Sequence, residues 1–100
     1  MSISEFDQLI AGDKPVLVDF YADWCEPCQW LEPILVQVDE MVEGRASTFK
    51  IDIDQFPDLR EKYSIMSVPV LIIFKNNEIR WRMNGFTNAN ELSRQLITYV

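Results

Sequence analysis

The apolar run PVLVDF at residues 15–20 restricts the fold more than any other feature of the chain. It is short and rich in β-branched side chains, which is typical of a strand that is buried on both faces of a sheet. Such a sheet needs helices on both sides, so the run predicts an α/β architecture. The length of 100 residues suits one domain with one core, and we expect that domain to span residues 1–100.

The spacing of apolar residues elsewhere predicts the helices and the remaining strands. Helices are expected from a Ser2–Glu5 capping box to Gly12, from Cys25 to Gly44, from Pro57 to Tyr63 and after an Asn88–Glu91 cap. Strands are expected at 48–53, 70–74 and 78–83, in addition to 15–20. The resulting order, α-β-α-β-α-β-β-α, predicts a mixed sheet that helices cover on both faces.

The last two strands are expected to form a hairpin, in which the two asparagines at 76–77 supply the positive φ angles of a tight turn. Alternation along the final strand places Ile79, Trp81 and Met83 on one face, with the intervening arginines on the other. We interpret these arginines as protection of a sheet edge. Trp81, and Trp30 on the second helix, are expected to lie in the core.

Charge and hydropathy argue against two classes of partner. The net charge of −7 disfavours nucleic acids and anionic membrane surfaces. The longest apolar run is too short to span a bilayer.

The first ten residues show no signal-peptide pattern, so we expect a reducing cytoplasm, where disulfides are transient. A mature chain trimmed of its signal peptide would read the same.

The two cysteines of the chain, Cys25 and Cys28, are spaced C-x-x-C. Zinc needs about four ligands and the chain has no histidine, so we expect no metal. A static disulfide across this step would close almost no loop and would contribute little stability. A redox-active dithiol fits better: if a helix begins at Cys25, its unpaired N–H groups and dipole stabilise a thiolate there. Cys28, one turn later, is expected to be buried beneath it and to resolve a mixed disulfide.

Three stretches of the chain resemble the thioredoxin family, in order and without gaps. VLVDFYADWCEPC resembles the family's strand and redox loop, and KIDIDQFPDLREKYSIMSVPVLIIFKNNE resembles the strand, helix, proline and hairpin that follow. The tripeptide at 84–86, NGF, resembles its glycine loop. Two departures stand out: Glu26 replaces the usual glycine, and the usual N-terminal strand is missing or vestigial. We therefore expect a thioredoxin fold with about four strands and four helices.

The resemblance implies roles for two charged residues. Asp19 interrupts an apolar run, and a buried carboxylate there should have a raised pKa. The resemblance implies that Asp19 lies beneath the dithiol and exchanges protons with Cys28. Lys50 resembles the family's lysine that pairs with this carboxylate, although a lone strand lysine is usually solvated.

The resemblance also implies a substrate surface around the dithiol. Its expected members are Trp24, Pro27, Val68, Pro69, Gly85 and Phe86. A cis Val68–Pro69 bond would pack against the dithiol, and the backbone of Val68 would pair with an extended substrate segment. Gly85 would let the peptide approach, and Phe86 would add apolar contact.

These features together predict a protein-disulfide reductase of thioredoxin type. Cys25 would attack a substrate disulfide and Cys28 would resolve it, without a bound cofactor. The resemblance implies disulfide-containing proteins as substrates, an NADPH-dependent thioredoxin reductase as electron donor, and a monomer active in electron transport and cell redox homeostasis. A thioredoxin-fold interaction module with little turnover is the open alternative. An oxidase or isomerase usually has histidine before the second cysteine, where this chain has Pro27.

Overall fold

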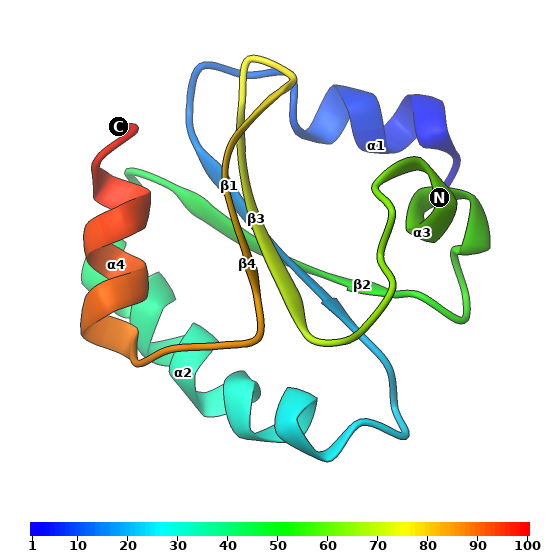
Figure 1. Cartoon of the computed structure of the whole chain (residues 1–100). Helices are drawn as coiled ribbons and strands as arrows, with labels where there is room; N and C mark the ends of the chain where they lie inside the picture. Colours follow the sequence, from blue (N-terminus) through cyan, green and yellow to red (C-terminus); the bar gives the residue numbers. More distant parts are fainter.

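A mixed sheet of four strands forms the centre of the computed structural model, which describes all residues from 1 to 100 (Figure 1). The strands are β1 (Val16–Tyr21), β2 (Ser47–Asp52), β3 (Val70–Lys75) and β4 (Glu78–Asn84), and the helices are α1 (Ile3–Leu9), α2 (Glu26–Val42), α3 (Pro57–Lys62) and α4 (Ala89–Ile97). The order across the sheet is β2-β1-β3-β4. The expected four strands and four helices are therefore confirmed, and no strand precedes α1.

The strand β1 is central because it pairs on both sides. It runs parallel to β2, with Asp19 opposite Lys50, and antiparallel to β3, with Phe20 opposite Val70. Its first five residues are buried, as the apolar run predicted. Because β1 and β2 are parallel, their carboxyl ends lie at the same edge of the sheet, and the segments that follow them meet there.

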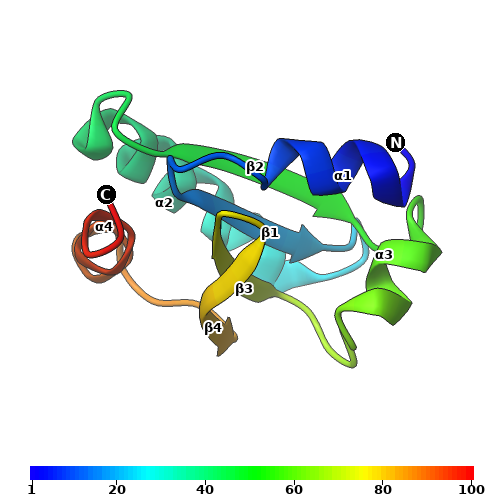
Figure 2. The same cartoon turned by 90° about the horizontal axis from the view of Figure 1, so that it is seen from above.

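The helices cover the sheet in two pairs. In both views α1 and α3 lie on one side of the sheet, and α2 and α4 lie on the other (Figures 1 and 2). Under α1 and α3 the core is aromatic, where Phe6, Phe20, Tyr63 and Phe74 pack together. Under α2 and α4 it is mainly aliphatic, and its members include Leu17, Leu31, Leu35, Leu92 and Leu96.

The caps and turns expected from the sequence are present. Ser2 and Glu5 form the capping box of α1, and the side chain of Asn88 accepts a hydrogen bond from the N–H of Glu91 at the start of α4. Asn76 and Asn77 have φ angles of 52° and 65°, as the predicted hairpin turn requires. No helix in the structure has both the length and the apolar character needed to cross a membrane.

The predicted alternation along β4 is wrong at its start. The register between β3 and β4 shifts at Ile73/Phe74, so that Trp81 lies opposite Ile73 while Ile79 lies opposite Phe74. Neighbouring residues of β3 point to opposite faces, so Ile79 and Trp81 also lie on opposite faces. A bulge adds one residue to one strand, and simple alternation in a sequence does not reveal it.

Candidate active site

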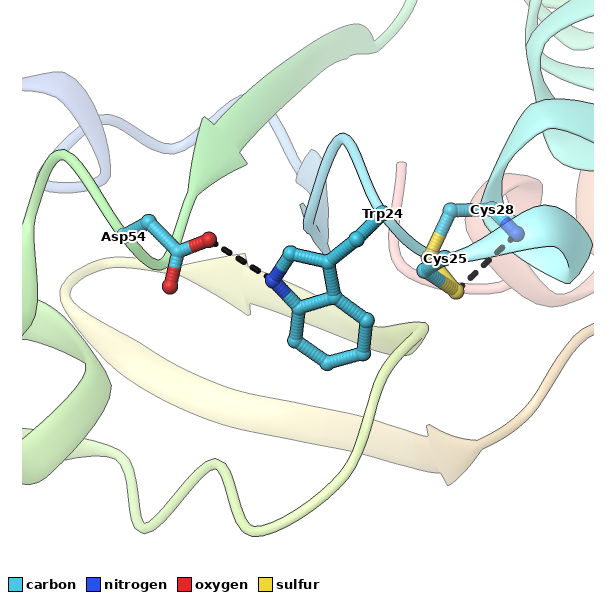
Figure 3. Close-up of a disulfide and its surroundings, with 4 residues drawn as sticks. All are labelled: Trp24, Cys25, Cys28 and Asp54. Carbon is cyan, nitrogen blue, oxygen red and sulfur yellow. Dashed lines mark hydrogen bonds between the residues drawn. A yellow bond between two sulfur atoms is a disulfide. The ribbon is translucent and has the colours of Figure 1, made fainter.

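The two cysteines form a disulfide at the start of α2 (Figure 3). Their Cα atoms lie 5.3 Å apart, within the normal range for a disulfide. Cys25 is the N-cap residue, and the N–H of Cys28 donates a hydrogen bond of 3.3 Å to its Sγ atom. This sulfur therefore occupies the place that a serine or aspartate oxygen usually takes at a helix start.

The local sequence explains why α2 begins at this point. After β1, the N–H of Cys25 donates to the carbonyl of Ala22 and closes a turn. Pro27 follows in the first turn of the helix, where its missing N–H removes a donor that no helix carbonyl would satisfy. Both cysteines are buried, Cys28 as expected, and they pack at the edge of the core under α1 and α3.

Asp19 is a fully buried carboxylate near the middle of the sheet. Leu17, two positions earlier, packs in the core under α2 and α4, so strand alternation directs Asp19 to that same face. Neither of its oxygens has a hydrogen-bond partner. Burial raises the pKa of Asp19 to about 7, against the lowering effect of the Lys50 charge. The expected rise in pKa is thus confirmed, and Asp19 can gain or lose a proton near neutral pH.

Lys50 does not pair with Asp19 as the resemblance implied. Its Nζ lies 2.6 Å from Oε1 of Glu32 on α2 and 4.3 Å from the ring centroid of Tyr21. The long side chain reaches a partly exposed partner, and this avoids the cost of burying its charge beside Asp19. Sequence reasoning missed Glu32, although its position four residues after Cys28 placed it on the same side of α2.

Trp24 lies on the surface beside the disulfide, with 70% of its side chain exposed. Its Nε1 donates a 2.8 Å hydrogen bond to Oδ2 of Asp54, and its ring lies between that carboxylate and the disulfide (Figure 3). The N–H of Asp54 in turn donates to the buried carboxylate of Asp52. Asp54 was not identified from the sequence. The parallel pairing of β1 and β2 was the available signal, because it brings the two following loops together.

The cis-proline segment lies at the same edge of the sheet. The Val68–Pro69 peptide bond is cis, as expected, and β3 begins at the next residue, opposite the end of β1. The N–H of Gly85 donates to the carbonyl of Pro69, which holds the glycine loop beside it. Gly85 has a φ of 119°, a conformation that other residues rarely adopt. The structure therefore gathers the redox loop and both expected substrate loops at one edge.

Large apolar side chains remain exposed near this edge. Met66 is 87% exposed, Trp30 is 53% exposed and Phe86 is 39% exposed. The core prediction for Trp30 is wrong, because the buried stripe of α2 runs through Cys28 and Leu31 and leaves Trp30 outside. Its ring instead packs nearly perpendicular to that of Phe86, with centroids 5.9 Å apart. Adjoining exposed aromatic rings such as those of Trp30 and Phe86 are typical of a protein-binding surface.

Comparison with known proteins gives a consistent result. The thioredoxin family model matches residues 1–98. Thioredoxin-like protein slr0233 of Synechocystis sp. is 43% identical over 98 residues, which cover 97% of this chain and 93% of that protein. Thioredoxin Y, chloroplastic, of Oryza sativa is 42% identical over 96 residues; these are 95% of this chain but 57% of that longer protein.

The structural comparison agrees with the sequence comparison. A mutant thioredoxin from Halobacterium salinarum superposes with a TM-score of 0.88 at 33% identity, covering 99% of this chain and 86% of that one. The chain therefore has the expected thioredoxin fold, an α/β sheet flanked by helices. The structure contains no cluster of three or more His, Cys, Asp or Glu side chains that could hold a metal ion.

Proposed function

The chain belongs to the thioredoxin family, and from this premise we propose how its residues carry out the reaction. It is a thiol-disulfide oxidoreductase that acts on protein disulfides. The observation that carries the assignment is the C-x-x-C disulfide at the start of α2, with the Cys28 N–H directed at the Cys25 sulfur. We propose that the physiological direction is reduction of the substrate.

Cys25 is the proposed nucleophile of the reduced protein. Its thiolate would accept the hydrogen bond from the Cys28 N–H and face the positive end of the α2 dipole, and both stabilise negative charge. Attack on a substrate disulfide breaks that bond and forms a mixed disulfide with Cys25. The first substrate sulfur leaves as a thiolate and takes up a proton.

Cys28 is the proposed resolving residue. After it loses its proton, its thiolate attacks the Cys25 sulfur of the mixed disulfide and releases the second substrate sulfur. Two electrons have then passed from the cysteine pair to the substrate, and the pair is oxidised, as in this structure. We propose Asp19 as the acceptor of the Cys28 proton, because Asp19 lies on the face of the sheet that α2 covers and feels the charge of Glu32, one turn after Cys28 on that helix. A pKa of about 7 suits proton exchange near neutral pH. Lys50 would act on Asp19 only through its charge.

The proposed substrate surface is the edge of the sheet where the loops meet. An extended substrate segment would pair with the backbone of Val68, beside Pro69, and would cross the apolar side chains of Trp24 and Phe86. Pro27 and Gly85 would border it, and the left-handed backbone of Gly85 has open space around its Cα. The exposure of Trp24 directly beside Cys25 supports this proposal, because aromatic side chains exposed at a reactive site offer apolar contact area to a bound protein.

We further propose that an NADPH-dependent thioredoxin reductase returns the oxidised pair to the dithiol. The proposed setting is a reducing cytoplasm. A disulfide between cysteines three positions apart adds little stability, and disulfides in that compartment are usually transient redox states. The chloroplast in the name of the Oryza sativa relative applies to that longer protein. We propose that the active form is a monomer.

Reduction of insulin by dithiothreitol tests the proposed direction. Catalytic amounts of the protein should speed the appearance of precipitated insulin chains, and Cys25→Ser should remove the effect. A rate no faster than with dithiothreitol alone would favour the alternative, a thioredoxin-fold interaction module with little turnover.

A further inference from the structure

The first two turns of α2 place a carboxylate beside an exposed aromatic ring. Glu26 and Trp30 lie four residues apart on this helix, so their side chains are neighbours on its surface. Both are exposed. Glu26 directly follows Cys25, so this pair of side chains borders the disulfide.

Phe86 holds the ring of Trp30 in place. The two rings meet at 74° with centroids 5.9 Å apart, a favourable edge-type contact. About half of the Trp30 side chain stays exposed despite this contact. Phe86 follows Gly85, whose N–H is bonded to the carbonyl of Pro69. The ring is thus fixed between α2 and the loop that borders the proposed substrate surface.

No lysine or arginine of the chain forms an ion pair with Glu26. The four ion pairs of the structure do not include it. Lys50 is paired with Glu32, and Arg82 donates to backbone carbonyls at the end of α3. Two more exposed carboxylates, Asp23 and Asp54, lie in the loops at the same edge and add negative charge.

We propose that Glu26, Trp30 and Phe86 form a cation-binding surface that selects disulfides flanked by arginine or lysine. A guanidinium group could bond to the Glu26 carboxylate while it stacks on the exposed indole of Trp30. Arginine should be preferred over lysine, because its planar group suits both contacts. The inference rests on the proposed reductase function and adds to it a class of substrate.

The test uses pairs of synthetic disulfide peptides that differ only by arginine or its neutral isostere citrulline near one cysteine. The residue is moved through the three positions on each side of the cysteine, and the reduced protein is mixed with each peptide at low salt. At the favoured position, reduction of the arginine peptide should be about fivefold faster, which is the effect of an exposed ion pair and a cation–π contact together. The ratio should fall as salt is added. Equal rates at all six positions would overturn the proposed cation-binding surface.

Variants separate the effect of the proposed cation-binding surface from that of the general negative charge. Glu26→Gln and Trp30→Leu should each lower the arginine-to-citrulline ratio, because each removes one of the two contacts, and the double variant should bring it close to one. Glu40→Gln, on the exposed face of the same helix, should keep the wild-type ratio. Asp23→Asn should lower the ratio less than Glu26→Gln does. An equal loss would overturn the proposed cation-binding surface in favour of a diffuse negative field. Reduction of the citrulline peptide by the wild type reports on the proposed function separately.

Discussion

The aromatic core under α1 and α3 and the redox end of the sheet are built on opposite principles. In the aromatic core, four rings pack with centroids 5.2 to 6.4 Å apart. At the redox end, Asp19 is buried without a hydrogen-bond partner and Trp24 is largely exposed. The first arrangement lowers the free energy of the folded state, while the second leaves groups unsatisfied or exposed. The groups that we propose to be reactive therefore lie where polar or aromatic side chains are least satisfied.

The largest effect should come from removing one sulfur at the redox end. Cys25→Ser should abolish insulin reduction, because serine supplies no thiolate at pH 7. The free energy of unfolding should stay within about 1 kcal/mol of the reduced wild type, since the substitution hardly changes the volume. Activity is measured by insulin turbidity and stability by urea unfolding.

The matched variant Cys28→Ser tests the order of the two cysteines. It should still attack a substrate but should fail to release it, so a covalent complex should accumulate and be visible by mass spectrometry. Normal insulin turnover by Cys28→Ser would contradict the assigned roles.

Substitutions in the aromatic core should lower stability and leave activity nearly unchanged. Phe6 is fully buried and packs against three other rings, so Phe6→Ala should lower the free energy of unfolding by about 3–5 kcal/mol. Insulin reduction per folded molecule should change little. The control Val36→Ala, at an exposed site on α2, should shift stability by less than about 0.5 kcal/mol. A loss of activity in Phe6→Ala that exceeds the loss of folded protein would mean that the two regions are coupled.

Asp19 should affect both stability and activity, because its burial changes the free energy of unfolding and also its ability to accept a proton. Its pKa is raised to about 7 from 3.8, so the folded state binds the proton more tightly than the unfolded state does. Stability should therefore fall as the pH rises from about 4 to 7 and should level off above that. Full expression of the shift would amount to on the order of 4 kcal/mol.

The variant Asp19→Asn isolates this contribution. It should flatten the pH dependence between pH 4 and 7 and should be more stable than the wild type at pH 8, as measured by urea unfolding across the pH range. It should also slow insulin reduction, since Cys28 would lose its proton acceptor. An unchanged slope of stability against pH would show that Asp19 is not the titrating group.

The smallest effect concerns Glu26, whose negative charge competes with the Cys25 thiolate for the start of α2. Two charges about 6 Å apart at an effective dielectric of 40 to 80 repel by about 0.7–1.4 kcal/mol, and salt screens part of this. Glu26→Gly should therefore speed the alkylation of Cys25 by neutral iodoacetamide at pH 7 by about two- to threefold, and less in high salt. Glu26→Gln separates charge from backbone flexibility: if it shows no acceleration, loop geometry explains the effect of glycine.

Local signals in the sequence predicted much of this structure. The apolar run of β1, the helix start at Cys25 and the turn at Asn76 each depend on a few neighbouring residues, and all three are present. The cis bond before Pro69 was expected only through the family resemblance.

Contacts between distant elements could not be predicted in the same way. The ion pair of Lys50 depends on whether its long side chain reaches Glu32 or Asp19, which the sequence does not decide. The surface position of Trp30 depends on the rotation of α2 about its axis. The hydrogen bond from Trp24 joins residues 30 positions apart, and only the packed sheet defines it.

The central position of β1 has a consequence for backbone motion. The redox loop is attached to a strand that is hydrogen-bonded to a neighbour on each side, whereas β2 has a neighbour on one side only. Amide hydrogens of β1 should exchange with deuterated solvent only when the whole molecule opens, while the outward amides of Thr48 and Lys50 should exchange through small local fluctuations. The cysteine pair is thus anchored to one of the two internal strands, and we expect the sheet to keep the same exchange pattern when the disulfide opens.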